Sequence, residues 1–209
     1  GRRVRILRRA LRPSLAIMAT TVTLACTDTR EIEATQDPVP SEGVFGTAPP
    51  AHGGVPSIIT LTPLEPTPDQ ETPFPRTPVM DQMGLAFAPR QMFVPVAQTV
   101  RFTNSEGALP HNVQIRAVEG GARLFNQDTM AGESIQFDFP EEGGYDIMCE
   151  MHPGMTAFIY ATSAPYFVFG DEDGSFHISN VPEGEYILSV WNTDPSLGSE
   201  QRLIVSPGP

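Results

Sequence analysis

The sequence predicts an all-β protein. Short segments in which apolar and polar residues alternate recur along the chain, as at Ile135, Phe137 and Phe139, and this period is typical of half-buried strands. The 209 residues include 22 prolines and 18 glycines, which favours short strands joined by many turns. No long amphipathic helical pattern follows the N-terminal segment.

The N-terminus has the pattern of an export signal. Six arginines precede a short apolar stretch, Ser14–Ala25, which is too short to span a bilayer. Residues 1–25 are therefore predicted to be a signal peptide. Thr23-Leu24-Ala25-Cys26 then resembles a lipoprotein signal with Cys26 as the lipidated residue, although the position three before the cysteine is Thr rather than the usual Leu. Cleavage by an ordinary signal peptidase near Ala25 is the alternative.

The charge of the remaining chain excludes nucleic acid as a partner. All six charges of the leader are arginines, so 7 basic residues (13 minus 6) face 25 acidic ones, a net charge of −18. Such a chain repels phosphate backbones. The acidic surface either steers a basic partner or only provides solubility.

The chain outside the leader divides by composition. Residues 27–54 are rich in Pro, Thr, Glu and Gly and are predicted to be a flexible linker. A β-branched run at Val55–Leu64 predicts one strand, and prolines follow up to residue 78. The later segments predict further strands at Met83–Phe87, Met92–Val96, Thr99–Thr103, Ser134–Phe139, Ala157–Ala161 and Tyr166–Phe169.

A short segment near residue 150 carries candidate metal ligands. Tyr145, Ile147 and Cys149 alternate as on the inward face of a strand, and His152 and Met155 follow on the turn that leaves it. A thiolate, an imidazole and a thioether form a soft set that suits copper. A zinc half-site is the alternative for Cys-x-x-His, but zinc needs a second such pair, and the only other cysteine is Cys26.

A second histidine motif makes the pattern specific. His111-Asn112-Val113, followed by Cys149-x-x-His152-x-x-Met155, resembles the cupredoxin family of plastocyanin- and amicyanin-type single-copper proteins. The resemblance implies a Greek-key β-barrel or sandwich that holds one type 1 copper ion. In that interpretation Cys149, His111 and His152 form a trigonal plane and Met155 is a weak axial ligand.

The resemblance also implies roles around the site. Asn112 is expected to tie the His111 loop to the Cys149 loop from the second coordination shell. An apolar collar around His152 is expected to dock redox partners briefly; its members are Leu109, Pro110, Met151, Pro153 and Gly154.

The segment Asp173–Tyr186 resembles a carboxypeptidase-regulatory-like β-sandwich. Three or four strands with one apolar face need a partner sheet, and the strand at 55–64 is the candidate. Residues 55–77 and 163–206 are therefore predicted to form one smaller sandwich into which a copper domain, residues 78–162, is inserted. The alternative is that these flanking strands form an incomplete sheet that packs against the barrel.

The leading functional hypothesis is an exported electron carrier of the periplasm or cell envelope, with redox partners such as a cytochrome and a lipid anchor as its only membrane contact. A copper carrier or store, and a cell-surface interaction module, are the alternatives. An enzyme is not expected, because only His52 and His177 remain for a second copper centre. No nucleophile–base pair or phosphate loop is present.

Overall fold

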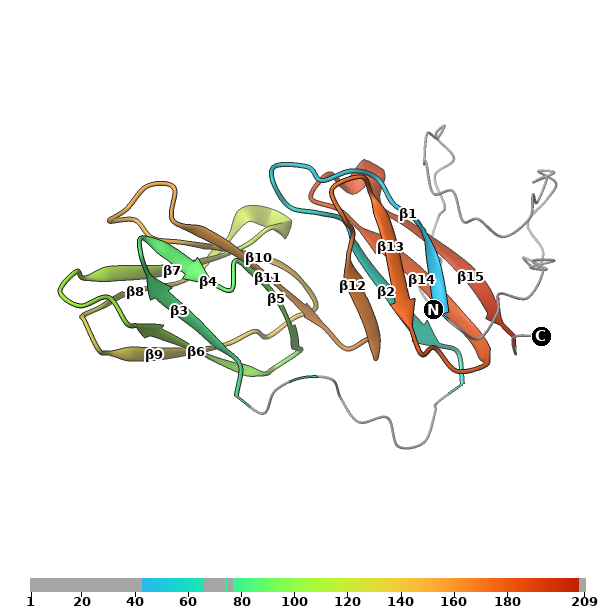
Figure 1. The fold of residues 1–209 in the computed structure, drawn as a ribbon, viewed down its shortest axis with the longest axis horizontal. Coiled ribbons are helices and arrows are strands. Elements are labelled where there is room, and N and C mark those ends of the chain that lie inside the picture. Colours follow the sequence, from blue (N-terminus) through green and yellow to red (C-terminus); the bar gives the residue numbers. More distant parts are fainter. Residues whose placement is uncertain (1–42, 66–73, 75–76, 207–209) are drawn as a thin grey trace. The chain divides into compact units, whose positions relative to one another are not determined.

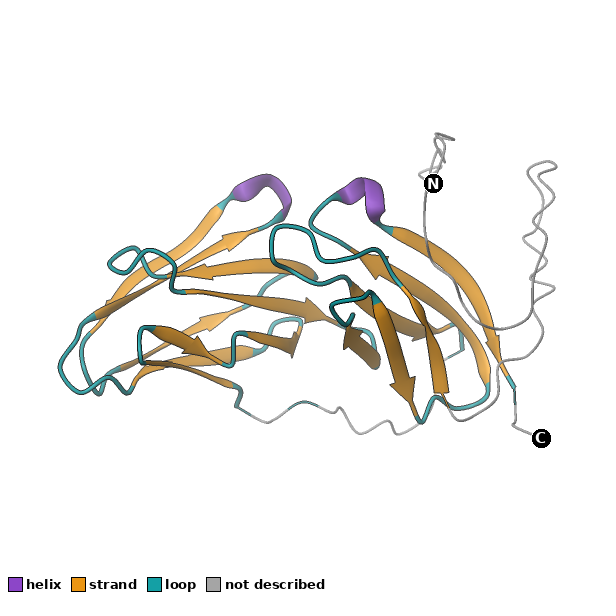
Figure 2. Cartoon of the chain, turned by 45° about the horizontal axis from the view of Figure 1, so that its top comes forward, coloured by secondary structure: helices purple, strands orange, loops and turns teal. Residues whose placement is uncertain are grey.

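The computed structural model describes residues 43–65, 74 and 77–206 (Figure 1). The predicted signal peptide and Cys26 lie outside these residues. The described chain is built almost wholly of strands, with two short 3-10 helices, η1 (Glu119–Gly121) and η2 (Pro195–Leu197) (Figure 2). The all-β prediction is confirmed. No helix among the described residues has the length and apolar character needed to cross a membrane.

The chain divides into two compact units, one of which is continuous and comprises the described residues 74 and 77–165. In this unit a five-stranded sheet has the order β5-β11-β10-β7-β8, and a four-stranded sheet has the order β4-β3-β6-β9. The strands of the first sheet are β5 (Gln91–Pro95), β7 (His111–Ala117), β8 (Arg123–Thr129), β10 (Gly143–Met148) and β11 (Thr156–Thr162). Those of the second are β3 (Val79–Met83), β4 (Ala86–Ala88), β6 (Thr99–Asn104) and β9 (Ser134–Asp138).

Alternation along these strands produces the core of the continuous unit. Val100 and Phe102 of β6 and Val113 and Ile115 of β7 are fully buried in one apolar cluster with Ile147 of β10. Burying a side chain of this size contributes about 2 kcal/mol each. The core therefore fixes which residues of β7 and β10 face inward, and with them the register at the strand ends.

Two strand predictions in this unit need correction. The expected strand Met83–Phe87 is wrong, because Gly84 and Leu85, both at positive φ, form a turn between β3 and β4. Strand β8 was not predicted. It lies at an edge of the five-stranded sheet and is mostly exposed, so its sequence lacks apolar alternation.

The other unit is built from both flanks of the chain. Its four-stranded sheet has the order β12-β2-β14-β15, and β1 pairs with β13 in a two-stranded sheet. Strand β2 (Ile58–Pro63) is antiparallel to both β12 (Tyr166–Phe169) and β14 (Gly184–Trp191). The remaining strands are β1 (Gly43–Thr47), β13 (Ser175–Ser179) and β15 (Ser199–Val205).

Strand β1 corrects the prediction for residues 27–54, which placed only a flexible linker there. Val44 of β1 is fully buried with Ile178 of β13 in the core of this unit. Only one apolar residue of β1 enters the core, so the local pattern is too short to indicate a strand.

Each unit contains a tyrosine that closes the turn before its own strand. The Tyr145 hydroxyl donates to the carbonyl of Glu141 at 2.7 Å, and the Tyr186 hydroxyl donates to that of Pro182 at 2.8 Å. In both cases a glycine at positive φ, Gly143 or Gly184, opens the strand. The hydrogen bond fixes where the turn ends and where the strand begins.

Candidate metal centre

Four candidate ligands are delivered to one end of the continuous unit. His111 is the first residue of β7, and Cys149 directly follows β10, which pairs with β7. The loop after Cys149 is closed by two backbone hydrogen bonds, from Cys149 N–H to the Met155 carbonyl at 3.1 Å and from Met155 N–H to the His152 carbonyl at 3.0 Å. The tight loop, with Gly154 at φ +95°, turns His152 back toward the end of β7.

The ligand atoms of three of these residues converge. His111 Nδ1 and His152 Nδ1 are 3.1 Å apart, and Cys149 Sγ is 3.6 Å from His152 Nδ1. All three ligand atoms lie within 4.8 Å of one another. Atoms that share one ion, at about 2.0 Å for nitrogen and 2.3 Å for sulfur, lie about 3 to 4 Å apart. The arrangement therefore has the dimensions of a metal site.

Met155 is buried and belongs to the same apolar cluster as Cys149. His111 and Cys149 are also buried, whereas His152 is half-buried. The two other histidines lie elsewhere: His52 and His177 are exposed residues of the other unit. Asn112 follows His111 on β7 and is buried.

The outer nitrogen of His111 supports the metal assignment. Its Nε2 is buried and has no hydrogen-bond partner within the described part of the chain, and a carboxylate oxygen, Glu106 Oε2, is 3.8 Å away. The Gly84 N–H holds the same oxygen at 2.6 Å. A proton on Nε2 faces this carboxylate and leaves the Nδ1 lone pair directed at Cys149 and His152, as metal ligation requires.

Burial lowers the pKa of His111, and the nearby His152 lowers it further, while Glu106 acts in the opposite direction. The lowered pKa keeps the imidazole neutral at neutral pH. A neutral imidazole is the form that binds a metal ion.

The sulfur of Cys149 accepts one backbone hydrogen bond, from the Asn112 N–H at 3.3 Å. This bond joins β7 directly to the residue after β10. The amide of Asn112 adds a second connection, because its Oδ1 accepts from the Glu150 N–H at 3.4 Å. Both strands that carry ligands are thus linked next to the sulfur.

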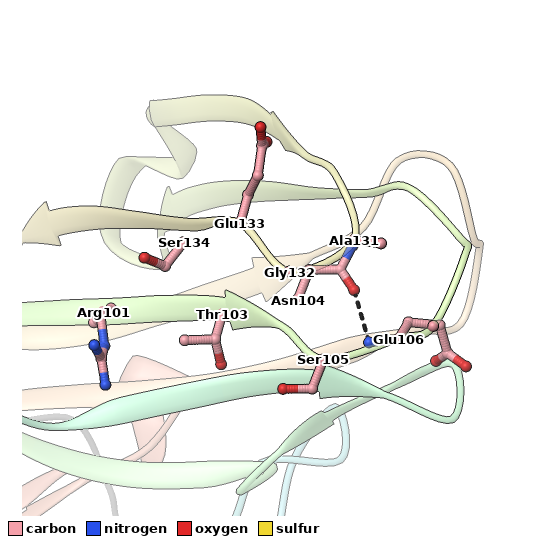
Figure 3. Close-up of a pocket in the computed structure, with 10 residues that line it drawn as sticks. Arg101, Thr103, Asn104, Ser105, Glu106, Ala131, Gly132, Glu133 and Ser134 are labelled. Atoms are coloured by element: carbon pink, nitrogen blue, oxygen red, sulfur yellow. Dashed lines mark hydrogen bonds between the residues drawn. The ribbon is translucent and has the colours of Figure 1, made fainter.

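Asn104, at the end of β6, organises the loop that leads to His111. Its Nδ2 donates to the carbonyls of Leu109 and Thr129, both at 2.9 Å, and its Oδ1 accepts from the Glu106 N–H at 3.0 Å. Figure 3 shows the last of these bonds as a dashed line, beside a polar hollow between the end of β6 and the turn after β8. The carboxylates of Glu106 and Glu133 point in different directions there, so the hollow offers no convergent ligand set.

Two further buried polar residues join the sheets beneath the site. The Thr129 hydroxyl donates to Gln82 Oε1 at 2.7 Å, and Gln82 Nε2 donates to the Asn112 carbonyl at 3.2 Å. These bonds connect β3, β7 and β8. Satisfied buried polar networks are rigid because breaking one bond leaves an unpaired group in a dry interior. Sequence reasoning did not identify Gln82, Asn104, Thr129 or Glu106 as part of the site, and no local pattern marks them.

The residues of the predicted apolar collar are exposed. Leu109 and Met151 are 43% and 40% exposed, and the three other residues of the predicted collar, Pro110, Pro153 and Gly154, are exposed as well. His152 is half-buried, and its chain neighbours Met151, Pro153 and Gly154 are three of these exposed residues.

The fold and the three converging ligand atoms define a β-sandwich metal protein with a soft, thiolate-containing site. Residues 77–161 match the model of the family of copper binding proteins, plastocyanin/azurin family. The cupredoxin resemblance is therefore confirmed for this segment, and copper is the cofactor of the family. Its members are electron carriers, generally without enzymatic activity.

Solved cupredoxin structures are similar to part of the chain. A novel purple cupredoxin from Nitrosopumilus maritimus is 27% identical over 41% of this chain and 99% of its own, with a TM-score of 0.37. An oxidized amicyanin mutant is 30% identical over 41% and 82%, with a TM-score of 0.38. Reduced auracyanin from Roseiflexus castenholzii is 22% identical over 42% and 98%, with a TM-score of 0.34. The search of curated proteins gave no match.

Proposed function

We propose that this protein is an exported type 1 copper protein that passes single electrons between redox partners, with His111, Cys149, His152 and Met155 as the copper ligands. The observation that carries the proposal is the convergence of two imidazole Nδ1 atoms and one thiolate sulfur within 4.8 Å. Met155 is included because it is buried beside Cys149 and because a thioether is the usual weak axial donor of such sites.

Bound copper supplies a one-electron couple between Cu(I) and Cu(II). The protein supplies a binding geometry that the backbone holds in advance. Two hydrogen bonds fix Cys149: its own N–H donates to the Met155 carbonyl, and its sulfur accepts from the Asn112 N–H. Because the ligands sit on paired strands and on a hydrogen-bonded loop, they move little when the charge of the ion changes.

Burial controls access to the site. His111, Cys149 and Met155 are shielded from water, while His152 reaches the surface within the apolar collar. We assign His152 as the point at which an electron enters or leaves, and the collar as a small docking surface for partners such as a cytochrome. The net charge of −18 outside the leader favours a partner with a basic surface. Export to the periplasm or cell envelope, and lipidation at Cys26, rest on the sequence pattern alone.

The test is the visible spectrum of the copper-loaded protein beside that of Cys149→Ser. We expect strong absorption near the red end of the visible range in the wild type and its loss in the variant, because the colour arises from the thiolate–copper bond. His177→Ala, at an exposed histidine of the other unit, is the matched control and should keep the full colour.

Met155→Leu tests the axial ligand. The variant should remain coloured but have a higher reduction potential, because the lost thioether donates more to Cu(II) than to Cu(I). A colourless copper-loaded wild type would refute the proposed function, and an unchanged potential in Met155→Leu would remove Met155 from the ligand set.

A further inference from the structure

Glu150, the residue directly after Cys149, is held in a ring of polar side chains on the outer face of β7 and β8. Its carboxylate accepts hydrogen bonds from Gln114 Nε2 and from Asn126 Nδ2, the latter at 2.9 Å, and lies 3.9 Å from Arg123 Nη1. A carboxylate can only accept hydrogen bonds, and here it accepts one from β7 and one from β8 and has a cation of β8 beside it. The side chain therefore fastens the ligand loop to the sheet from outside.

Asn112 closes the ring. Its Nδ2 donates to Asn126 Oδ1 at 2.7 Å and to Asp128 Oδ1 at 3.0 Å, while its Oδ1 accepts from the Glu150 N–H. Asn126 thus bridges Asn112 and Glu150 with its two amide atoms. The ring runs from Asn112 through Asn126 to the Glu150 carboxylate, and back from the Glu150 backbone to Asn112.

Burial shows that the ring covers the sheet. Asn112 and Gln114 alternate with the core residues Val113 and Ile115, so they face outward, yet they are only 3% and 2% exposed. Gln114 is held at both ends, because its Oε1 accepts from Arg116 Nε at 2.7 Å. Loss of the Glu150 carboxylate would leave the buried Gln114 amide without its acceptor, which costs more than a surface contact does.

We propose that Glu150, through Asn126 and Gln114, is the positioning residue that keeps the Cys149 sulfur within hydrogen-bonding distance of the Asn112 N–H. It thereby sets the properties of the copper–thiolate bond. This inference rests on the proposed function. The physical link is short: the Asn112 backbone binds the sulfur, and the Asn112 side chain is part of the ring. An N–H···S bond withdraws electron density from the thiolate, so its loss makes the thiolate a stronger donor to Cu(II).

The test compares four variants in the full-length, copper-loaded protein. Glu150→Ala removes the acceptor, Glu150→Gln keeps its size and one acceptor oxygen, and Asn126→Ala removes the bridge from an exposed position without changing charge. Glu119→Gln is the charge-matched control, because η1 follows β7 at the end opposite His111, about 20 Å along the strand.

We expect copper to be lost to a chelator about tenfold faster from Glu150→Ala and Asn126→Ala, as for other groups that orient a metal ligand. The absorption bands of both should shift, and the reduction potential of Asn126→Ala should fall. Glu150→Gln should stay within about twofold of the wild type in copper loss and keep its bands, because one acceptor remains. Glu119→Gln should match the wild type throughout.

The inference is overturned if Glu150→Ala and Asn126→Ala keep wild-type bands and rates of copper loss. It is also overturned if they lower only the melting temperature of the metal-free protein, or if Glu150→Gln and Glu150→Ala behave alike, since charge alone would then explain the effect. A wild type that binds no copper or shows no colour would instead refute the proposed function, so the two failures are distinguishable.

Discussion

Replacing Asn104 with alanine tests whether the His111 loop depends on one buried amide. The change removes the bonds to the carbonyls of Leu109 and Thr129 and the bond from the Glu106 N–H. Asn104 is only 1% exposed, so water does not readily replace them. At about 1 kcal/mol for each bond, the variant should lose about 3 kcal/mol of unfolding free energy.

The measurement must report on the correct unit. The single tryptophan, Trp191, lies in the discontinuous unit, so its fluorescence does not follow the copper unit directly. Hydrogen exchange of the metal-free protein reports on the copper unit directly, because the amides of β6, β7 and β10 belong to that unit. A loss of 3 kcal/mol corresponds to a fall in protection of roughly a hundredfold for amides that exchange by global unfolding of that unit.

Thr103→Ala is the matched control on the same strand. Its hydroxyl makes one partly buried bond, to Asp81 Oδ1 at 2.6 Å, so it should cost about 1 kcal/mol. If Asn104→Ala costs no more than this control, the amide does not organise the loop and the reasoning is refuted.

Four further variants have defined outcomes. Tyr145→Phe and Tyr186→Phe should each destabilise their own unit by about 1 kcal/mol in calorimetry, since each loses a hydroxyl bond to the carbonyl four residues earlier; an unchanged melting temperature would contradict this. Burial raises the pKa of Asp146, so the folded protein holds that proton more tightly than the unfolded chain does, and the stability that this carboxyl contributes is lost as pH rises through the folded pKa. Asp146→Asn should therefore be more stable than the wild type at pH 7 in denaturant titrations, by up to about 1 kcal/mol, with the gain vanishing toward pH 3.8. Gly174→Ala should cost about 2 kcal/mol or more, because φ is +83° and the new Cβ would lie 2.3 Å from the Ala48 carbonyl oxygen; denaturation followed by Trp191 fluorescence should show the loss, while the visible spectrum stays unchanged.

Strands with one clear apolar face could be predicted from the sequence. The alternation at Tyr145, Ile147 and Cys149 indicated β10 because the same side-chain period that fills the core is written in consecutive residues. Strand β8 gave no such signal, since its side chains are mostly exposed and its place comes from backbone pairing with β7. Strand β1 is defined in the same way by its pairing with β13, from more than 100 residues away.

The candidate ligands were also visible in the sequence, since Cys149, His152 and Met155 are three residues apart and carry the chemistry themselves. Among the groups that orient them, Asn112 could be predicted because it directly follows His111, but the more distant groups could not. Thr129 and Gln82 are 47 residues apart, and Gln114 and Glu150 are 36 apart. Glutamine, threonine and glutamate are ordinary residues on a β-protein surface, and nothing in their neighbours marks them.

The sequence by itself determined the candidate metal-ligand atoms, their order along the chain and the inward faces of the main strands. These features depend only on residue type and on the alternation of apolar and polar residues along a strand. Only the tertiary structure decided that Glu106 faces His111 and that Glu150 is fastened by Asn126 and Gln114. Hydrogen bonds between distant residues depend on how strands pair across sheets, and that pairing is set by the packing of the whole core.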